Sequence, residues 1–264
     1  MSIPLTRGNA RVKEARKLSR RPVRAGRRLF LADGPNAVAG ALSLDDCVVE
    51  VFATPAATEE HADLADSGAH WTLVDEHALA SLSDSVTPAG LVAVCRFLDV
   101  PLDEIFSGRT PPRLVAFCAD VRDPGNAGTV VRTADAAGAD AVVLAGSSVD
   151  AYHPRTVRAS AGSLFNLPVA MEPDPLAAVG AAQEAGLVVL AADGAGELDL
   201  YDADEQLARP TAWLFGNEAW GLPAELTNAA DHRIRIPIHG RAESLNLATA
   251  AALCLYASAR VHRR

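Results

Sequence analysis

The sequence predicts an α/β protein in two parts: a smaller N-terminal domain and a C-terminal domain built on a parallel sheet. Three observations predict this fold class. Short apolar runs alternate with helical patterns along the 264-residue chain. In the second half the alternation is strict, which is typical of a parallel sheet covered by helices on both faces. Between the halves, Pro101, Pro111 and Pro112 indicate a linker over residues 98–112.

The first part, residues 1–97, is expected to begin with a basic helix and to continue as a compact α/β unit. The helix is expected over residues 7–28, with a break at Pro22. Strands are expected at 29–31, 48–53, 70–74 and 91–97, and further helices at 35–42, 58–67 and 76–82.

The second part, residues 113–264, is expected to alternate between strands and helices to its end. Strands are expected near 113–119, 141–145, 167–171, 187–192, 211–215 and 233–238, and helices near 126–137, 154–162, 175–185, 201–207, 223–230 and 244–260. No G-x-G-x-x-G motif follows the first of these strands, and no P-loop is present. An ordinary dinucleotide-binding domain is therefore disfavoured, as is the common methyltransferase version of it.

The charge is distributed unevenly along the chain. The net charge is −9, but residues 1–30 carry ten Lys or Arg residues against Glu14 alone, so this segment has a charge of +9 and the remainder −18. A basic segment on an acidic body fits local binding of phosphate groups, and the alternative is a solvated basic helix that only aids solubility.

Cysteine usage and the N-terminus indicate a reduced, cytoplasmic protein. The four cysteines are scattered without C-x-x-C spacing, which disfavours a zinc site and predicts no bound metal. The basic N-terminal segment lacks the apolar stretch of a signal peptide, and no apolar run reaches the about 20 residues that span a bilayer. We therefore expect cytoplasmic localisation and no membrane association.

Two of the expected strands end in polar loops that contain glycine. The run 211–215 stops at Gly216-Asn217-Glu218, and the run 233–238 leads into a loop that enters the last helix at Ser244. In open α/β sheets, ligands lie outside the carboxyl ends of the strands, and helix N-termini there offer unpaired N–H donors. The pattern predicts a small-molecule pocket at this edge.

Polar residues of three segments are expected to meet at that edge. Asn126 lies where it would cap a helix, and Arg132 follows close to two turns later. Each has an ordinary structural alternative: Arg132 as a surface arginine, and Glu218, Ser244 and Asn246 as simple helix caps. Their joint position at one edge of one sheet favours a site.

These segments carry a family resemblance. The stretches N-A-G-T-V-V-R-T-A from Asn126, L-F-G-N-E-A-W-G-L-P from Leu214 and I-P-I-H-G-R-A-E-S-L-N-L from Ile236 resemble the three ordered motifs of the SpoU/TrmH RNA 2′-O-ribose methyltransferases. The N-terminal part resembles the substrate-binding domain of that family, which is similar to ribosomal protein L30e. Asp33 stands where the family usually has Glu, and Ala89 where Gln is common.

The resemblance implies a fold and a reaction. It implies a deep trefoil knot near the C-terminus, a homodimer, and methyl transfer from S-adenosylmethionine to a ribose 2′-hydroxyl of RNA. Ribosomal RNA is expected rather than transfer RNA, because the N-terminal domain resembles that of the ribosomal members. The last helix is expected to supply part of the dimer contact, through Leu253, Leu255 and Tyr256.

The resemblance also implies the residues of the site. The catalytic set is Arg132, Asn126, Glu218, Ser244 and Asn246. The cofactor-binding set is Leu214, Gly216, Asn217, Ile236, Ile238, Leu245 and Asn246. With the basic helix, the expected RNA-binding set is Arg11, Lys13, Arg16, Lys17, Arg20, Arg21 and Arg122.

Alternatives remain for the role of Arg132 and for the function. In the family the matching arginine abstracts or activates the hydroxyl proton, yet a guanidinium has a pKa above about 12, so Arg132 is equally expected as a cation that orients or stabilises. We hypothesise that Asn126 and Glu218 orient it. The alternative functions are a transfer RNA methyltransferase, a non-catalytic RNA-binding assembly factor, and an enzyme that uses another nucleotide-like molecule.

Overall fold

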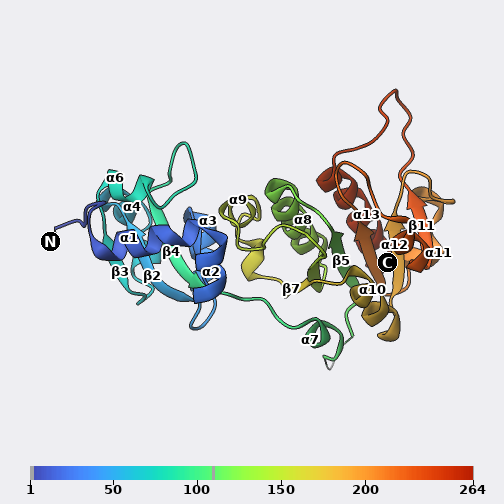
Figure 1. Ribbon diagram of the computed structural model, residues 1–264, viewed down its shortest axis with the longest axis horizontal. Coiled ribbons are helices and arrows are strands. Elements are labelled where there is room, and N and C mark those ends of the chain that lie inside the picture. Colours follow the sequence, from blue (N-terminus) through green and yellow to red (C-terminus); the bar gives the residue numbers. More distant parts are fainter. Residues whose placement is uncertain (1–2, 109–110, 264) are drawn as a thin grey trace. The chain divides into compact units, whose positions relative to one another are not determined.

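The computed structural model describes residues 3–108 and 111–263, so the chain ends and residues 109–110 of the expected linker lie outside it. By their internal contacts the residues form two compact units (Figure 1). Unit 1 comprises Met1–Leu98 together with Tyr152–Asn166, and unit 2 comprises Asp99–Ala151 together with Leu167–Arg264.

Unit 1 is built on a four-stranded mixed sheet with the strand order β1-β4-β2-β3. Strand β4 pairs antiparallel with β1 and β2, whereas β2 and β3 are parallel. The strands are β1 (Leu29–Asp33), β2 (Val48–Ala53), β3 (Trp71–Leu73) and β4 (Leu91–Arg96). The helices of residues 1–98 are α1 (Ala10–Arg16), η1 (Lys17–Ser19), α2 (Arg21–Arg27), α3 (Pro35–Leu42), α4 (Pro55–Glu60), α5 (Ala62–Ala65) and α6 (Glu76–Ala80).

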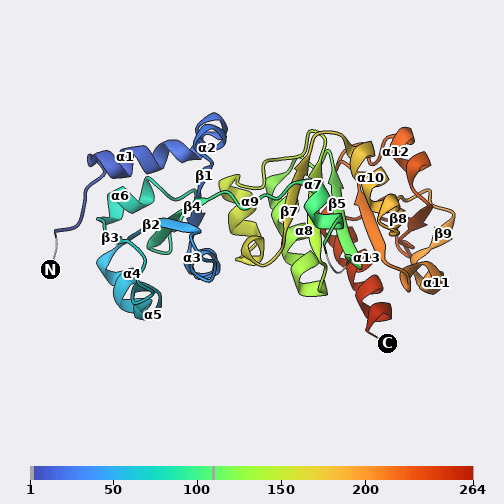
Figure 2. The same cartoon turned by 90° about the horizontal axis from the view of Figure 1, so that it is seen from below.

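Helices cover both faces of this sheet. Helices α1, α2 and α6 lie on one side of it, and α3, α4 and α5 on the other (Figure 2). Val12 and Leu18 from the N-terminal segment and Leu79 from α6 pack with Phe52 and Val94 in one buried cluster. The basic N-terminal segment is therefore part of the core of unit 1.

The break in the basic helix differs from the predicted one. The helix is interrupted at residues 17–20, where a 3-10 turn separates α1 from α2, and Pro22 lies in the first turn of α2. The first turn tolerates proline because the N–H groups there have no intrahelical acceptor.

Residues 152–166 complete unit 1 from a distant part of the sequence. The segment contains α9 (Pro154–Ala159) and η2 (Ser163–Phe165). The ring of Tyr152 stacks on Phe97 at 3.9 Å between centroids and lies 4.7 Å from Phe30. Its hydroxyl oxygen accepts a hydrogen bond from the Leu98 N–H at 2.6 Å. These contacts attach α9 to β1 and to the end of β4.

Unit 2 contains a seven-stranded sheet in which every pair of neighbours is parallel, with the order β7-β6-β5-β10-β8-β11-β9. The strands are β5 (Leu114–Ala119), β6 (Ala141–Ala145), β7 (Val169–Glu172), β8 (Val188–Ala192), β9 (Leu198–Asp199), β10 (Thr211–Phe215) and β11 (His232–Arg235). The helices are α7 (Leu102–Phe106), α8 (Pro124–Ala137), α10 (Pro175–Glu184), η3 (Leu200–Asp202), α11 (Asp204–Leu207), α12 (Ala224–Ala229) and α13 (Leu247–His262). The predicted α/β class and the parallel sheet are confirmed.

The two faces of this sheet are covered by different helices. Ile105 of α7, Val179 of α10 and Leu226 of α12 pack with strand residues such as Leu214 in one buried cluster. On the other face, the buried Trp213 donates its indole N–H to Ser258 Oγ of α13 at 2.9 Å. Burial of an indole with its N–H satisfied is a strong anchor, since removing such a ring typically costs about 3–5 kcal/mol.

Part of the expected linker is folded. The stretch 98–112 contains α7, whose Ile105 is buried in the core of unit 2. Leu102, Ile105 and Phe106 recur at helical spacing, and this apolar face outweighs the prolines around it.

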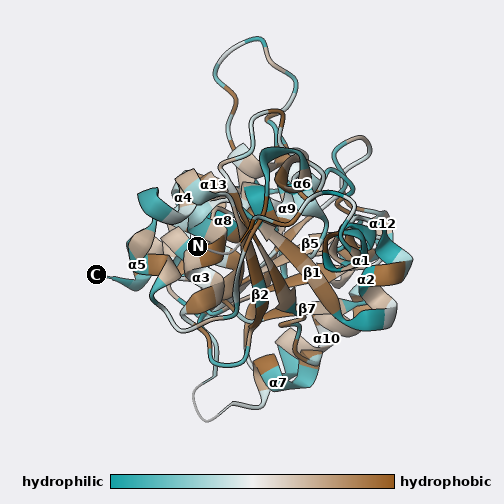
Figure 3. Ribbon diagram, turned by 90° about the vertical axis from the view of Figure 1, so that its left-hand side faces the viewer, coloured by the Kyte–Doolittle hydropathy of each residue, from teal (hydrophilic) through white to brown (hydrophobic). Residues whose placement is uncertain are grey.

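The distribution of hydropathy follows these layers. The central strands are the most hydrophobic segments (Figure 3). All four cysteines are buried as free thiols. Among the described residues, no helix has the length and apolar character needed to cross a membrane.

Candidate active site

A cavity of about 310 Å³ lies in unit 2 at the carboxyl ends of β8, β10 and β11. Because neighbouring strands are parallel, their carboxyl ends meet at one edge. The lining includes Gly216, Asn217, Ile236, Ile238 and Leu245 of the predicted cofactor-binding set. Leu214 and Asn246 of that set do not line it: Leu214 is buried in the core, and of the residues around Asn246 only its neighbours Leu245 and Leu247 line the cavity.

The floor of the cavity contains residues that were not predicted. Ala192, Asp193 and Gly194 follow β8 and line the cavity, as does Ile234 of β11. A signal for them exists in the sequence, since an Asp-Gly pair directly after a buried strand has the same pattern as Gly216-Asn217 after β10.

The loop after β10 is a tight turn that leaves no room for a side chain at its start. Asn217 and Gly221 exchange two backbone hydrogen bonds of 2.9 Å. A Cβ atom on Gly216 would lie 2.3 Å from the Gly221 carbonyl carbon, which no real contact allows. Asn217 also accepts a hydrogen bond from the Ala219 N–H and donates one to the Asp120 carbonyl oxygen. The turn is therefore fixed to the loop after β5.

Glu218 connects this turn to the start of α8. Its Oε1 accepts hydrogen bonds from the Asp123 N–H and from Asn126 Nδ2, each at 3.1 Å, and its Oε2 accepts one from the Arg122 N–H at 3.3 Å. Burial acts to raise the pKa of Glu218, but these hydrogen bonds outweigh it and hold the pKa below its usual value. The carboxylate is therefore ionised at neutral pH.

Asn126 bridges the other two motifs. Its Oδ1 accepts a hydrogen bond from Asn246 Nδ2 at 3.1 Å, while its own Nδ2 binds Glu218. The predicted cap role of Asn126 is wrong: α8 begins at Pro124, and Asp123 is the N-cap residue that accepts the Asn126 N–H at 2.8 Å. Because Asp123 caps the helix, the Asn126 side chain is available for the bridge.

Asn246 has a structural role as well. The last helix begins at Leu247 rather than at Ser244, and Asn246 Oδ1 caps it by accepting the N–H groups of Ala248 and Thr249. A cap of this type contributes about 1 kcal/mol to helix stability. Ser244 is exposed and lines the cavity.

Arg132 lies apart from this hydrogen-bond network. It is exposed on α8, and among the described residues no hydrogen bond or ion pair involves its guanidinium. Asn126 and Glu218 bind each other and do not bind Arg132 in this structure. Gly128 occupies the same helix face one turn earlier, so no side chain there separates Arg132 from the helix N-terminus.

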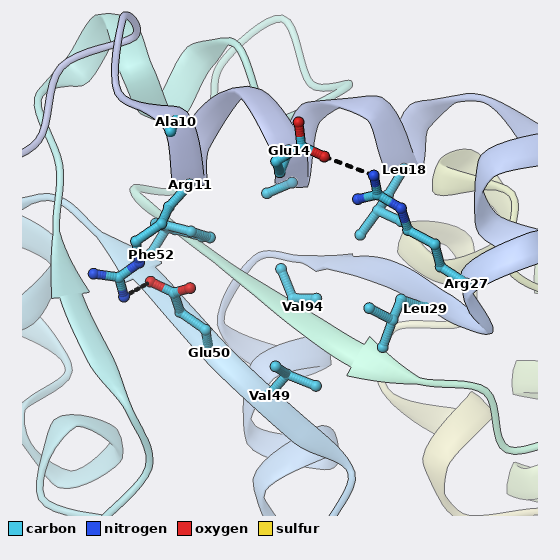
Figure 4. Close-up of a pocket in the computed structure, with 11 residues that line it drawn as sticks. Ala10, Arg11, Glu14, Leu18, Arg27, Leu29, Val49, Glu50, Phe52 and Val94 are labelled. Carbon is cyan, nitrogen blue, oxygen red and sulfur yellow. Dashed lines mark hydrogen bonds and ion pairs between the residues drawn. The ribbon is translucent and has the colours of Figure 1, made fainter.

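The predicted RNA-binding residues of unit 1 fall into two groups. Arg11 forms an ion pair with Glu50 (Figure 4) and donates to Thr72 Oγ1. Lys17 pairs with Glu14 at 2.5 Å. Lys13, Arg16, Arg20 and Arg21 have no ionic partner among the described residues.

The paired residues surround an open pocket of about 280 Å³. Arg27 also binds Glu14, at 2.6 Å, and the floor is apolar, with Phe52 and Val94 (Figure 4). Hydrogen bonds from Lys17 and Arg27 lower the pKa of Glu14 to about 2. The charges at the rim are therefore largely balanced, and the unpaired lysine and arginines are the ones available to phosphate.

Arg122, the predicted RNA contact of unit 2, lies beside an aromatic ring. Its guanidinium carbon is 5.2 Å from the centre of the Trp220 ring, within the range of a cation–π contact. Among the residues that the structure describes, no group of His, Cys, Asp or Glu side chains is arranged to hold a metal ion.

Comparison with protein families identifies both parts of the chain. Residues 113–256 match the model of the SpoU rRNA Methylase family. Residues 9–93 match the MRM3-like substrate binding domain.

Individual proteins are similar over nearly the whole length. The 23S rRNA (guanosine(2553)-2′-O)-methyltransferase RlmP of Bacillus subtilis is 33% identical over 251 residues, which cover 94% of this chain and 95% of that protein. The crystal structure of an AdoMet-bound rRNA methyltransferase from Sinorhizobium meliloti has a TM-score of 0.83 at 34% identity, covering 96% and 95% of the two chains.

A third similar protein also has a known structure with a cofactor. The SpoU methyltransferase AviRb from Streptomyces viridochromogenes in complex with AdoMet has a TM-score of 0.82 at 31% identity, and the match covers 96% of this chain and 98% of that one.

Proposed function

Because the chain belongs to the SpoU rRNA methylase family, we propose that it transfers the methyl group of S-adenosylmethionine to a ribose 2′-hydroxyl of 23S ribosomal RNA. The observation that carries the proposal is the hydrogen-bonded contact of Asn126, Glu218 and Asn246 beside the cavity. These residues come from three separate segments, and a purely structural cap would not need all three.

The cavity fits S-adenosylmethionine by shape and by chemistry. Ile236 and Leu245 offer apolar surface to an adenine ring, and the missing side chain at Gly216 lets a ligand approach the backbone. Leu245 and Ile238 are each 38% exposed, which a bound ligand would reduce. The acidic side chains of Glu218 and Asp193 also line the cavity, which suits a cationic donor. When bound, S-adenosylmethionine supplies an electrophilic methyl group on a positively charged sulfur.

The residues around the cavity position the acceptor. Glu218 and Asn126 hold the start of α8 against the turn after β10, which sets the direction of α8 and of Arg132. Arg132 contributes a guanidinium, the planar side chain that binds phosphate and carboxylate oxygens through several N–H donors. It binds the RNA phosphate or the ribose oxygen on which negative charge develops, and Ser244 faces the ribose. The ribose oxygen forms the new bond to the methyl carbon as the S–C bond breaks, which leaves S-adenosylhomocysteine, and the hydroxyl proton passes to solvent.

Replacement of Arg132 tests this assignment. We expect Arg132→Ala to reduce methyl transfer to a 23S ribosomal RNA transcript by about 100-fold or more, the usual effect of losing one group that stabilises developing charge. Binding of S-adenosylmethionine, measured by calorimetry, should stay unchanged, since Arg132 does not line the cavity. Arg132→Lys should recover part of the activity if a cation suffices.

The control is Arg209→Ala, which removes an exposed arginine of unit 2 outside the cavity lining. Full activity of Arg132→Ala would contradict the role of Arg132. If the wild-type protein binds S-adenosylmethionine but never methylates the transcript, the activity itself is wrong, and the non-catalytic assembly factor becomes the better description.

We assign residues 1–97 to RNA binding, residues 98–112 to the connection and residues 113–264 to catalysis, except that residues 152–166 fold as part of unit 1. The match of residues 9–93 to a substrate-binding domain supports this division. The exposed Lys13, Arg20 and Arg21 and the half-buried Arg16 are the proposed phosphate contacts of this part.

The proposed assembly is a homodimer through α13. Leu253 and Tyr256 are 41% and 52% exposed and lie three residues apart on one helix face. Leu255, which was also expected there, is fully buried in its own unit and cannot contribute. The trefoil knot stays a proposal that rests on the family resemblance.

A further inference from the structure

The environment of Trp220 is unlike that of the other tryptophans. Trp213 is fully buried, and the indole N–H groups of Trp213 and Trp71 donate to the hydroxyl oxygens of Ser258 and Thr58. Trp220 is 57% exposed, and within the described residues its indole N–H has no hydrogen-bond partner. Trp220 therefore adds little to the core.

The backbone that carries Trp220 is held in one position. It lies inside the turn closed by the two hydrogen bonds between Asn217 and Gly221, and the Asn217 side chain binds both the Ala219 N–H and the Asp120 carbonyl oxygen. Gly221 has a φ of +70°, which favours glycine and fixes the exit of the turn. An exposed indole on such a turn is a prepared surface that loses little entropy on binding.

The guanidinium of Arg122 lies over one face of the Trp220 ring. Its guanidinium lies 5.2 Å from the ring centre, while its backbone N–H is bound by Glu218. The side chain and the backbone of Arg122 are thus attached to the same turn, and they connect the ring to the network of Asn126 and Asn246.

The pair lies directly beside the cavity. Ala219 and Gly221, the two neighbours of Trp220, line it, whereas Trp220 does not. A ligand that binds next to the cavity therefore lies near an exposed indole, and the Arg122 guanidinium lies over one face of that ring.

We propose that Trp220, supported by Arg122, is the stacking surface for an unpaired base of the RNA substrate next to the methyl donor. The inference rests on the proposed function. A ribose hydroxyl that must approach the donor belongs to a nucleotide drawn out of its helix, and such bases are commonly stacked on aromatic side chains. The Arg122 cation suits the adjacent phosphate, and stacking on Trp tolerates any base.

The test separates binding of RNA from binding of the cofactor. We expect Trp220→Ala to raise the KM for a 23S ribosomal RNA transcript between about 5-fold and about 100-fold, the range that follows from the loss of one stacked base. The kcat at saturating RNA and the Kd for S-adenosylmethionine should remain within about 2-fold, since Trp220 does not line the cavity. Trp220→Phe keeps a flat ring and should restore most of the affinity.

A direct measurement complements the kinetics. Because Trp220 is the most exposed of the three tryptophans, binding of the transcript should quench the long-wavelength part of the fluorescence of the wild-type protein. The matched control is Tyr201→Ala, which removes a 64% exposed aromatic residue of unit 2 that lies outside the cavity lining.

Four outcomes would overturn the proposal. Two concern RNA: an unchanged KM for the transcript in Trp220→Ala, and the absence of fluorescence quenching when the transcript binds the wild type. The other two are a loss of S-adenosylmethionine affinity in Trp220→Ala, and a changed sedimentation coefficient of that variant, which would show that Trp220 contacts another protein chain instead of RNA. If the wild-type protein binds the transcript without methylating it, the proposed function fails, while quenching and affinity still decide the role of Trp220.

Discussion

Glu218 binds three hydrogen-bond donors although its side chain is largely exposed. Two of the donors are backbone N–H groups just before α8, and the third is the side-chain amide of Asn126. Each bond favours the ionised form, so the carboxylate stabilises the junction between the turn after β10 and the start of α8.

This arrangement predicts how stability depends on pH. The pKa of Glu218 is lowered below the usual 4.5 in the folded protein, so its contribution is present above pH 4.5 and is lost as the pH falls toward and through the lowered value. The wild type should therefore be more stable than Glu218→Gln at neutral pH, and the gap should close below pH 4.5.

Urea unfolding of both proteins across this pH range measures the gap. A suitable control is Glu225→Gln, an exposed glutamate in the first turn of α12 that has no side-chain contact among the described residues. A difference between wild type and Glu218→Gln that stays constant down to acidic pH would show that the stabilisation does not come from the charge of Glu218, and would contradict this prediction.

At the scale of one residue, the sequence predicts where a site residue lies in the fold better than it predicts which side chains that residue binds. The place of Glu218 follows from a strand that ends in glycine, and the cavity is found where this pattern predicts it. The cap of α8 is Asp123 rather than Asn126, because Pro124 starts the helix two residues earlier than expected. The partners of Asn126 come from residues 92 and 120 positions away, and no local pattern indicates them.

At the scale of elements, the basic helices α1 and α2 combine packing with charge. Val12 and Leu18 are buried, so removal of the N-terminal segment would open the core of unit 1 as well as remove its charge. Point substitutions on the outer face are therefore the cleaner probe of RNA binding.

We expect the variant Lys13→Ala/Arg20→Ala/Arg21→Ala to weaken RNA binding and to reduce its salt dependence. If each side chain contacts one phosphate, the slope of log K against log salt concentration should become shallower by about 2, since each contact to single-stranded RNA contributes about 0.7. Filter binding of a 23S ribosomal RNA transcript at several salt concentrations measures this slope.

Two comparisons define the result. Arg209→Ala in unit 2 should leave the slope as it is, and the binding of S-adenosylmethionine should be equal in all variants. If the triple variant keeps the full slope of the wild type, the alternative stated above holds, and the basic face only aids solubility.

The charge pattern alone does not separate the free cations from the paired ones. The sequence shows ten basic residues near the N-terminus, yet Glu50, which binds Arg11, lies 39 positions away on β2. Which charges are neutralised depends on how β2 packs against α1, and this is a property of the tertiary structure.

At the scale of the whole molecule, the exposed apolar face of α13 predicts a change of assembly on mutation. We expect Leu253→Asp to shift the protein from dimer to monomer, because a buried unpaired carboxylate opposes association. Sedimentation velocity across a range of protein concentrations measures the state.

Val49→Asp serves as the control, since Val49 is a comparable side chain of 37% exposure on β2 in unit 1. It should sediment like the wild type. A monomeric wild-type protein would contradict the proposed dimer. A Leu253→Asp variant that remains dimeric would show that the dimer contact lies outside this face of α13.

The fold class and the succession of strands and helices along the chain could be predicted, because the apolar residues of strands and of helices recur at different spacings. The attachment of residues 152–166 to unit 1 could not. The helix at 154–159 was expected, but its neighbours in sequence are β6 and β7 of unit 2, and nothing local indicates that Tyr152 packs on Phe97.

This attachment means that the chain crosses between the units three times, at residues 98, 151 and 166. A protein fragment that ended at Leu98 would lack Tyr152, which packs on the rings of Phe30 and Phe97. The remaining fragment would contain α9 without the strands on which it packs. Chimaeras that exchange unit 1 between relatives must therefore transfer residues 152–166 together with residues 1–98, or the transferred unit lacks the ring that packs on Phe30 and Phe97.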